Sequence, residues 1–385
     1  MSDGTVQYDD IRIEITGRCN LKCLTCHAAD RNDPVAIKKE LTTEEVLAII
    51  AEAQGLGIRE FELIGGEPFL HKDLFQIIDA CDGTVNICTN GHFFTEKNLS
   101  LLAERKKIRD FCISMDGTES HDRIRVGSSY RKVLDGIAQL KRALPWARVL
   151  VQTTCNGQNQ DDLMSLYEAL FPEEVRPHTW SLNLFWKAGR GIEHFDTLCV
   201  RDMKAMMERF RAIILRHRKD GRPFILNIYN TYNSLIADQD HEEYEEYGAM
   251  DLTSHPCAYH LGKPCIRSDG SVEFCNSLHA VSVNIREAGS LKNALQSQAF
   301  RDFYAFRVGD IRHCPICRYL NICGGGCRGE ALTHLKDMRL PDPIACRMME
   351  LVESEIMPAL SEQEQAKYRK LIRGDLNFPP KPGTL

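Results

Sequence analysis

Residues 18–26 read Arg-Cys-Asn-Leu-Lys-Cys-Leu-Thr-Cys, and this run places Cys19, Cys23 and Cys26 in the spacing C-x3-C-x2-C. Cysteine thiolates hold iron–sulfur clusters, and three of them from one tight loop can bind three irons of a [4Fe-4S] cube. A closed structural zinc site needs four ligands, and His27 is the only near candidate for a fourth. The spacing therefore favours a cluster with one open iron, and a zinc knuckle is the alternative.

A second motif, Gly65-Gly66-Glu67-Pro68, directly follows a strand-like segment at residues 59–64. The cysteine loop likewise follows a strand-like segment, residues 11–15, and a helix is predicted between the motifs over residues 43–56. This helix begins with a capping box, Thr42-Thr43-Glu44-Glu45. Two successive glycines let a backbone approach a ligand closely, and the glutamate adds a carboxylate, so the turn is suited to bind a ligand.

With both motifs at strand ends, the sequence resembles the radical S-adenosylmethionine (SAM) enzymes. The resemblance implies that the three loop cysteines hold a [4Fe-4S] cluster and that SAM chelates its open iron. It also implies that the Gly-Gly-Glu-Pro turn binds the amino group of SAM through backbone carbonyls and the Glu67 carboxylate. One departure is visible at Thr25, where the family usually has an aromatic residue. That departure puts adenine packing at this point in doubt, but not the ligation of the metal.

Strand-like and amphipathic helical segments alternate as far as about residue 220. A helix over residues 201–217 carries methionines at helical spacing, which we assign to the core rather than to a cofactor surface. Six β/α units predict an α/β fold whose parallel sheet has its site at the C-terminal strand ends. The resemblance implies a partial (β/α)6 TIM-like radical SAM barrel. Further strands are expected at residues 85–89, 111–117, 149–154 and 180–185.

Polar residues at two of these strand ends are further candidates for the SAM site. Ser114 and Asp116 match the Ser-x-Asp-Gly pattern that lies beside the SAM ribose in the family. Gln152 on the fifth strand and Asn156 at its end are expected to reach toward the cofactor. Ordinary strand and loop polarity is the alternative for residues of this kind.

The second half of the chain contains a denser cysteine pattern that resembles a SPASM domain, the auxiliary-cluster extension of certain radical SAM enzymes. Three successive glycines, residues 324–326, fit a backbone wrapped tightly around a cluster. A pair of structural zinc ribbons is the alternative. By resemblance, eight thiolates form two [4Fe-4S] sites, a first auxiliary set of Cys257, Cys265, Cys275 and Cys327 and a second of Cys314, Cys317, Cys323 and Cys346.

The cysteines outside these sets are expected to be small buried hydrophobes, and they are Cys81, Cys88, Cys112, Cys155 and Cys199. Cys155, just past the fifth strand, is the one expected to face the barrel mouth. A thiol there can donate a hydrogen atom to a substrate radical, as a radical epimerase requires.

Length, charge and cysteine content agree with this interpretation. A chain of 385 residues with 43% hydrophobic residues can form two domains. The net charge of −6 gives no electrostatic case for nucleic acid or an anionic membrane, and no apolar run approaches the roughly 18 residues of a membrane span. Sixteen cysteines without an export signal favour a reducing, cytoplasmic location. The expected parts are a radical SAM barrel over residues 8–235, an acidic linker over 236–254, a SPASM domain over 255–350, and a C-terminal helix and tail over 351–385.

These features predict an enzyme in which a 5′-deoxyadenosyl radical abstracts hydrogen from a substrate C–H bond and the auxiliary clusters take the second electron. The first interpretation is oxidation of a carbinol carbon in a sugar, aminocyclitol or other polar small molecule. The second is maturation of a ribosomal precursor peptide by crosslinking or epimerisation. A plain iron–sulfur electron carrier is a third interpretation, which the intact SAM motifs disfavour. A flavodoxin- or ferredoxin-type electron donor is implied by the family.

Three features bear on the substrate. Cys19 lies so near the start of the sequence that we expect no N-terminal peptide-recognition domain before it. Sulfatase-maturing relatives carry a catalytic aspartate where this chain has Asn276, whose amide is not a useful base. We expect the substrate between SAM and the first auxiliary set, in a site with amide and indole groups suited to a hydroxylated ligand. Its predicted walls are Asn156, Asn183, Trp186 and residues 227–230.

Overall fold

The structure, a computed structural model, describes residues 8–28, 30, 32–229, 231, 250–257 and 263–373. Within these ranges one sheet has the strand order β10-β9-β8-β1-β2-β3-β4-β5-β6-β7. Strands β1 to β7 pair in parallel, β8 is parallel to β1, and β9 and β10 are antiparallel to their neighbours. The strands are β1 (Asp10–Glu14), β2 (Glu60–Ile64), β3 (Thr84–Thr89), β4 (Ile108–Ser114), β5 (Arg148–Cys155), β6 (Thr179–Leu184), β7 (Ile225–Ile228), β8 (Cys265–Ile266), β9 (Ser271–Glu273) and β10 (Ser282–Asn284).

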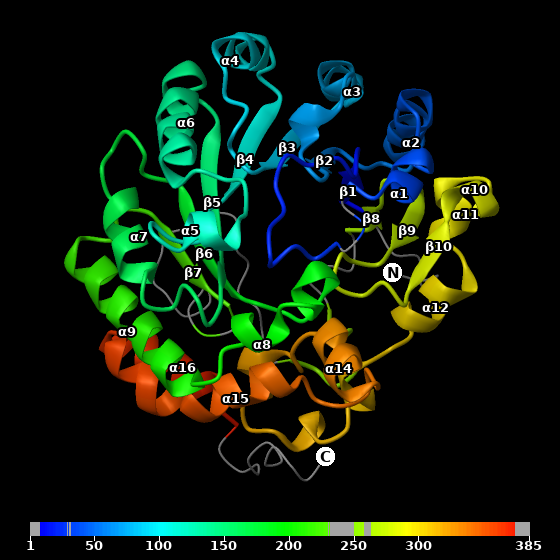
Figure 1. The fold of residues 1–385 in the computed structure, drawn as a ribbon. Coiled ribbons are helices and arrows are strands. Elements are labelled where there is room, and N and C mark those ends of the chain that lie inside the picture. The colour runs from blue at the N-terminus through cyan, green and yellow to red at the C-terminus, as the bar shows by residue number, and fades with distance from the viewer. Residues whose placement is uncertain are drawn as a thin grey trace.

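Helices cover the outer side of this sheet, which curves into an open barrel (Figure 1). A helix lies between each parallel strand and the next from β1 to β7, because parallel neighbours need a crossover connection. The predicted α/β partial barrel is therefore confirmed. The helices are α1 (Pro34–Lys38), α2 (Thr43–Gly55), α3 (Leu74–Ala80), α4 (Glu96–Ala103), α5 (His121–Ile124), α6 (Tyr130–Ala143), α7 (Leu163–Leu170), α8 (Phe195–Leu198), α9 (Met203–Lys219), α10 (Ile285–Ala288), α11 (Leu291–Leu295), α12 (Gln298–Tyr304), α13 (Leu320–Cys323), α14 (Arg328–Leu335), α15 (Pro343–Leu351) and α16 (Glu362–Leu371).

Local sequence accounts for two of the helices on which the barrel depends. The capping box predicted for α2 is present: Thr42 Oγ1 accepts the N–H of Glu45 at 3.2 Å, and Glu45 Oε2 accepts the N–H of Thr42 at 2.7 Å. Helix α9 buries an apolar stripe toward the sheet, as its helical spacing predicts. The predicted core assignment is confirmed for Met203, Met206, Met207, Phe210 and Ile214.

The second half of the chain extends the barrel sheet past β1. Strand β8 pairs with β1, with Cys265 opposite Arg12, and β8 to β10 lie beside β1 in Figure 1. On the other side, α15 packs against α9. The sequence prediction included none of the strands β7 to β10. Most of the predicted acidic linker, residues 236–249, lies outside the described residues. None of the helices in the described part of the chain combines the length and apolar character of a membrane span.

Candidate active site inside the open barrel

The loop after β1, called the cluster loop below, carries Cys19, Cys23 and Cys26. Separate segments of the chain hold its two ends. The side-chain amide of Asn32 accepts the N–H of Cys19 at 2.9 Å and donates to its carbonyl at 2.8 Å. The carbonyl of Cys26 accepts the N–H of Arg190 at 2.9 Å. The loop is thus fixed by contacts from both sides of the barrel mouth.

The three loop thiols lie close enough to influence one another. Burial raises the pKa of Cys23 to about 12, and negative charge on Cys26 and Cys19 contributes to the rise. Thiolates are the form that ligates a metal, and metal binding offsets the cost of removing their protons. Cys23 therefore lies close to Cys19 and Cys26, and three thiols from one loop are a donor set that fits one shared iron–sulfur group.

The Gly-Gly-Glu-Pro turn packs directly against this loop. The N–H of Gly66 donates to the carbonyl of Thr16 at 2.7 Å, and the N–H of Glu67 donates to the carbonyl of Arg18 at 2.8 Å. A Cβ on Gly66 would lie 2.2 Å from the Arg18 oxygen, so no larger residue fits there. Glycine at this position is required by contact with the cluster loop, in addition to any need of a ligand.

Glu67 is fully buried, and its carboxylate is engaged by protein groups. It accepts the Thr89 hydroxyl and the Asn90 N–H, each at 2.8 Å, and the Phe69 N–H at 3.3 Å. Burial raises its pKa to about 7. The Asn90 amide in turn donates to Asn20 Oδ1 at 2.8 Å. Glu67 therefore ties the ends of β2 and β3 to the cluster loop, and its contact with the amino group of SAM stays a prediction.

A row of uncharged polar side chains crosses the inner face of the barrel. Ser114 on β4 pairs with Gln152 on β5, Gln152 pairs with Ser181 on β6, and Ser181 pairs with Asn227 on β7. Paired residues on neighbouring strands point to the same face of a sheet. Gln152 is exposed although its strand has neighbours on both sides, and the other three are partly exposed. The inner face therefore has free space above this row.

A second pair of polar residues lies one step closer to the strand ends. Thr154 on β5 pairs with Asn183 on β6, and both are partly exposed. Trp186, just beyond β6, is also half-buried. The structure therefore brings the predicted wall residues Asn183 and Asn227 to the inner face, and Trp186 follows closely in the chain. Asn156 is fully buried, against its predicted place in the wall, and Asn230 lies outside the described residues.

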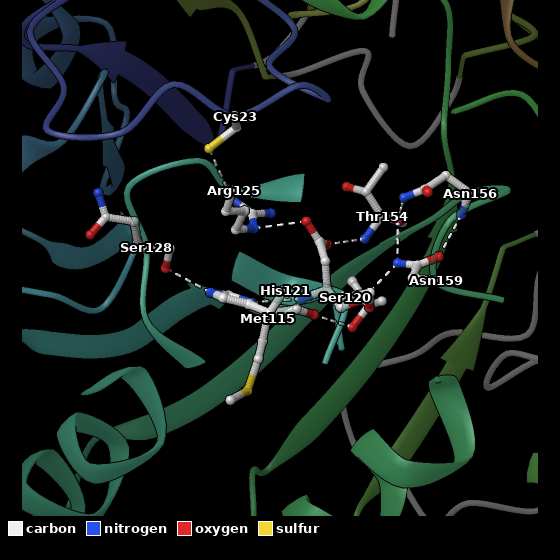
Figure 2. A network of polar contacts seen from close by, with 12 residues as sticks. Cys23, Met115, Ser120, His121, Arg125, Ser128, Thr154, Asn156 and Asn159 are labelled. Atoms are coloured by element: carbon white, nitrogen blue, oxygen red, sulfur yellow. Dashed lines mark hydrogen bonds and ion pairs between the residues drawn. The ribbon is translucent and has the colours of Figure 1, made fainter. Parts of the chain in front are cut away.

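Asp116 and Asn156 are placed differently from Ser114 and Gln152. Both are fully buried. Asp116 forms an ion pair with Arg125 at 2.7 Å. The Asn156 amide donates to the Thr154 carbonyl at 2.8 Å and accepts the Gln158 N–H at 2.9 Å. These polar groups serve the loops around the site (Figure 2), and their predicted contacts with SAM remain predictions.

The expectation that Cys155 faces the barrel mouth needs correction. On β5, Val149, Val151, Thr153 and Cys155 alternate with the inward-facing residues and are all buried. Cys155 is fully buried in the hydrophobic core between sheet and helices, and burial raises its pKa well above the usual value. This placement disfavours its predicted role as a hydrogen donor.

The second auxiliary set surrounds a small cavity. Burial raises the pKa of Cys314 and of Cys346 to about 12, and nearby cysteine charges contribute. Ile316, between two of these cysteines, is exposed, so the site lies near the surface. The lining consists of Cys314, Cys317, Leu320, Cys323, Gly325, Cys346 and Met349. Four thiols around a shared space fit a group larger than a single ion.

Three members of the first auxiliary set also lie together. Burial raises the pKa of Cys257, Cys275 and Cys327 to about 12, and these cysteines add to one another's shifts. The fourth, Cys265, is on β8 beside Arg12. Burial raises the pKa of Cys265 and of Cys275, and the positive charge of Arg12 offsets part of the rise at both cysteines. Arg12 is therefore close to both Cys265 and Cys275.

Sequence reasoning missed several polar residues that contact cysteines in the auxiliary sets and inside the barrel. Asp342 is buried, accepts the Cys327 N–H at 2.8 Å, and caps α15, the helix that carries Cys346. It thus connects the two auxiliary sets. Inside the barrel, Arg12 pairs with Glu62 at 2.8 Å, and the Cys88 thiol donates to Glu62 at 3.0 Å. No local motif marks these residues, because their partners are distant in the sequence.

Comparisons with known proteins agree with this architecture. A family model described as the radical SAM superfamily matches residues 13–170. An "AdoMet-dependent heme synthase" of Oleidesulfovibrio alaskensis is 25% identical over 343 residues, which cover 86% of each chain. Among solved structures, SuiB of Streptococcus suis bound to precursor peptide SuiA has a TM-score of 0.68 at 16% identity and covers 89% of this chain and 77% of its own. Native anSMEcpe with bound AdoMet and Cp18Cys peptide has a TM-score of 0.69 at 17% identity, and the match covers 93% of this chain and 99% of anSMEcpe.

The family match spans the end of β1, the cluster loop, the Gly-Gly-Glu-Pro turn and strands β2 to β5. The structural likeness extends through the cysteine-rich second half. Residues 13–170 therefore match the radical SAM superfamily, and the chain has the fold of the solved SuiB and anSMEcpe structures.

Proposed function

We propose that this enzyme oxidises a polar, hydroxylated small molecule by two electrons, with SAM and three [4Fe-4S] clusters as cofactors. The observation that carries the proposal is the row Ser114–Gln152–Ser181–Asn227 on the inner face. Hydroxyl and amide groups both donate and accept hydrogen bonds. A row of them in an accessible interior is suited to a ligand with several hydroxyl groups.

Cys19, Cys23 and Cys26 would hold the cluster that binds SAM. SAM bound to this cluster supplies hydrogen-atom abstraction from an unactivated C–H bond. The protein's own part is to fix the loop, through the Asn32 and Arg190 contacts, and to shape the space around the reacting carbon. Ser114 and Gln152 would face SAM, while Ser181 and Asn227, at the far end of the row, would face the substrate.

The two auxiliary sets would hold the clusters that accept the second electron. Eight cysteines allow both clusters to be fully ligated, which suits electron transfer more than direct binding of substrate. Tyr229, just past β7, is near both auxiliary sets, since charge on Cys327 of the first set and, to a lesser degree, on Cys323 of the second contributes to the rise in its pKa. The substrate at the Asn227 end of the row would therefore lie toward the first auxiliary set, as a route for the electron requires.

Peptide maturation is the second candidate, because the solved structures of SuiB and anSMEcpe with similar folds contain bound peptides. The relatives named heme synthase suggest a third kind of substrate, a tetrapyrrole. A carboxylate-bearing tetrapyrrole needs cationic partners, and the polar row offers hydroxyl and amide groups instead. The polar row therefore favours a neutral hydroxylated substrate.

The test is a screen for transfer of deuterium into 5′-deoxyadenosine. The reconstituted enzyme is incubated with SAM, a reductant and polyols, sugars or aminocyclitols that carry deuterium on carbinol carbons. Precursor peptides and carboxylated tetrapyrroles, deuterated at candidate positions, form the parallel arms. Transfer from a carbinol carbon supports the proposal, and transfer from a peptide or a tetrapyrrole alone contradicts it.

A further inference from the structure

Arg125 lies directly opposite Cys23 of the cluster loop (Figure 2). The N–H of Lys22 donates to the Val126 carbonyl at 2.9 Å, and the N–H of Leu24 donates to the Ile124 carbonyl at 2.8 Å. These two bonds flank Cys23 on one segment and Arg125 on the other, so they fix the two residues side by side. Arg125 Nη1 lies 3.9 Å from Cys23 Sγ.

A buried carboxylate orients the guanidinium. Asp116 Oδ2 lies 2.7 Å from Arg125 Nε, and the two side chains are 0% and 12% exposed. The other oxygen of Asp116 accepts the Thr154 N–H at 2.8 Å. The Asp116 carbonyl accepts the Asn159 amide at 2.8 Å, and the Asp116 N–H donates to His121 Nδ1 at 3.2 Å. With Nε in an ion pair with the carboxylate, Nη1 lies toward the sulfur.

Burying an ion pair of this kind brings little net stability, because both charges lose their hydration. A contact between the guanidinium and a cluster ligand gives the pair a further effect. A cation near a metal cluster favours the state with more negative charge, and hydrogen bonds to ligand sulfur act in the same direction. The effect is strong where water is excluded, since screening is weak there.

We propose that Arg125 is a positioning residue that acts through Cys23 and raises the reduction potential of the SAM-binding cluster. One electron from an external donor converts [4Fe-4S]2+ to [4Fe-4S]+, and no covalent bond forms or breaks in this step. The added negative charge is stabilised by the guanidinium that Asp116 holds in place. The inference rests on the proposed ligation of a cluster by Cys23.

The experiment is a redox titration of the reconstituted full-length enzyme, followed by electron paramagnetic resonance. The signal that is missing from a variant with Cys19, Cys23 and Cys26 all changed to Ala belongs to the SAM-binding cluster. If iron content and all signals survive in that variant, the assignment of the cluster fails, and this outcome is distinct from a failure of the Arg125 inference. The variants to compare are Arg125→Met, Arg125→Lys, Asp116→Asn and Arg123→Met.

In Arg125→Met the equilibrium constant for one-electron reduction is expected to fall about tenfold, which is about 59 mV for one electron. Arg125→Lys, which keeps the charge, restores most of the loss, and Asp116→Asn gives an intermediate shift. Arg123 is exposed and contacts the Glu119 carbonyl, so Arg123→Met serves as the control with unchanged potential. An unchanged potential in Arg125→Met with full iron content overturns the inference. If Arg125→Met holds no cluster, a further variant, Arg125→Gln, takes its place, and a potential in Arg125→Lys as low as that of Arg125→Gln overturns the inference.

Discussion

Ser114 and Gln152 face each other across the parallel pair β4–β5, and their row continues to Ser181 and Asn227. Gln152 remains exposed although it lies on an interior strand of the sheet. A polar side chain is left exposed in such a position only where the barrel interior has room for water or a ligand. This relationship supports our proposal that the substrate lies between the cluster loop and the second half of the chain.

Removing the amide at the far end of the row tests its contact with the substrate. Asn227→Ala is expected to raise the KM for the substrate about tenfold, the value of one lost hydrogen bond. Reductive cleavage of SAM without substrate should stay at the wild-type rate, because Asn227 is far along the row from Ser114. Gln298→Ala, at an exposed site on α12, is the control. Equal KM values for both variants and the wild type would contradict the assignment.

Metal analysis tests the ligand sets. Three [4Fe-4S] clusters need about twelve irons per chain. Changing Cys19, Cys23 and Cys26 together to Ala should remove about four of them and abolish SAM cleavage. The eight later cysteines should retain the remainder. Zinc as the dominant metal after anaerobic purification, or SAM cleavage at the wild-type rate in the triple variant, would refute the ligand assignment.

The close packing of the Gly-Gly-Glu-Pro turn makes a sharp stability prediction. Gly66→Ala drives a Cβ to within 2.2 Å of the Arg18 carbonyl oxygen, so the free energy of unfolding should fall by about 1–3 kcal/mol. The cluster loop should bind iron less tightly as well. Gly55→Ala is the matched control: a Cβ there meets nothing within 4 Å, and alanine should stabilise the helix by at most about 1 kcal/mol. Chemical denaturation measures the free energy of unfolding of both variants. Similar values for Gly66→Ala and Gly55→Ala would count against the packing argument.

Buried His121 predicts a loss of stability in acid. It accepts the Asp116 N–H at Nδ1 and contacts the Ser128 hydroxyl at 2.8 Å through Nε2. Burial lowers its pKa to about 3, whereas a histidine in an unfolded chain has a pKa of about 6.5. Between these values the unfolded chain binds a proton that the folded protein does not, so the free energy of unfolding falls as pH drops through this window. His121→Gln should show a shallower decline from pH 6.5 to 4, and an unchanged slope would argue against this placement.

The first six strands and helices α2 and α9 could be predicted, because alternation, helical spacing and capping are local properties of the sequence. Strand β8 could not, since it consists of Cys265 and Ile266 alone and is defined by its pairing with β1 and β9. The orientation of Asp116 was equally hidden, because its partner Arg125 reaches it only in the folded protein. For Cys155 a signal was present: it has the same parity as Val149 and Val151 on the predicted strand, and parity alone assigns it to the buried face.

The stoichiometry of the reaction, measured in deuterated water, tests the account most directly. The enzyme is supplied with SAM, a reductant and the substrate that the deuterium screen identifies, and 5′-deoxyadenosine, oxidised product and product deuterium are counted together. We expect one 5′-deoxyadenosine per oxidised product and no solvent deuterium on the reacting carbon, with product lost but SAM cleavage retained in Cys275→Ala. Solvent deuterium on that carbon without net oxidation, or full turnover by folded Cys275→Ala that lacks its cluster, would contradict two-electron oxidation through the auxiliary clusters.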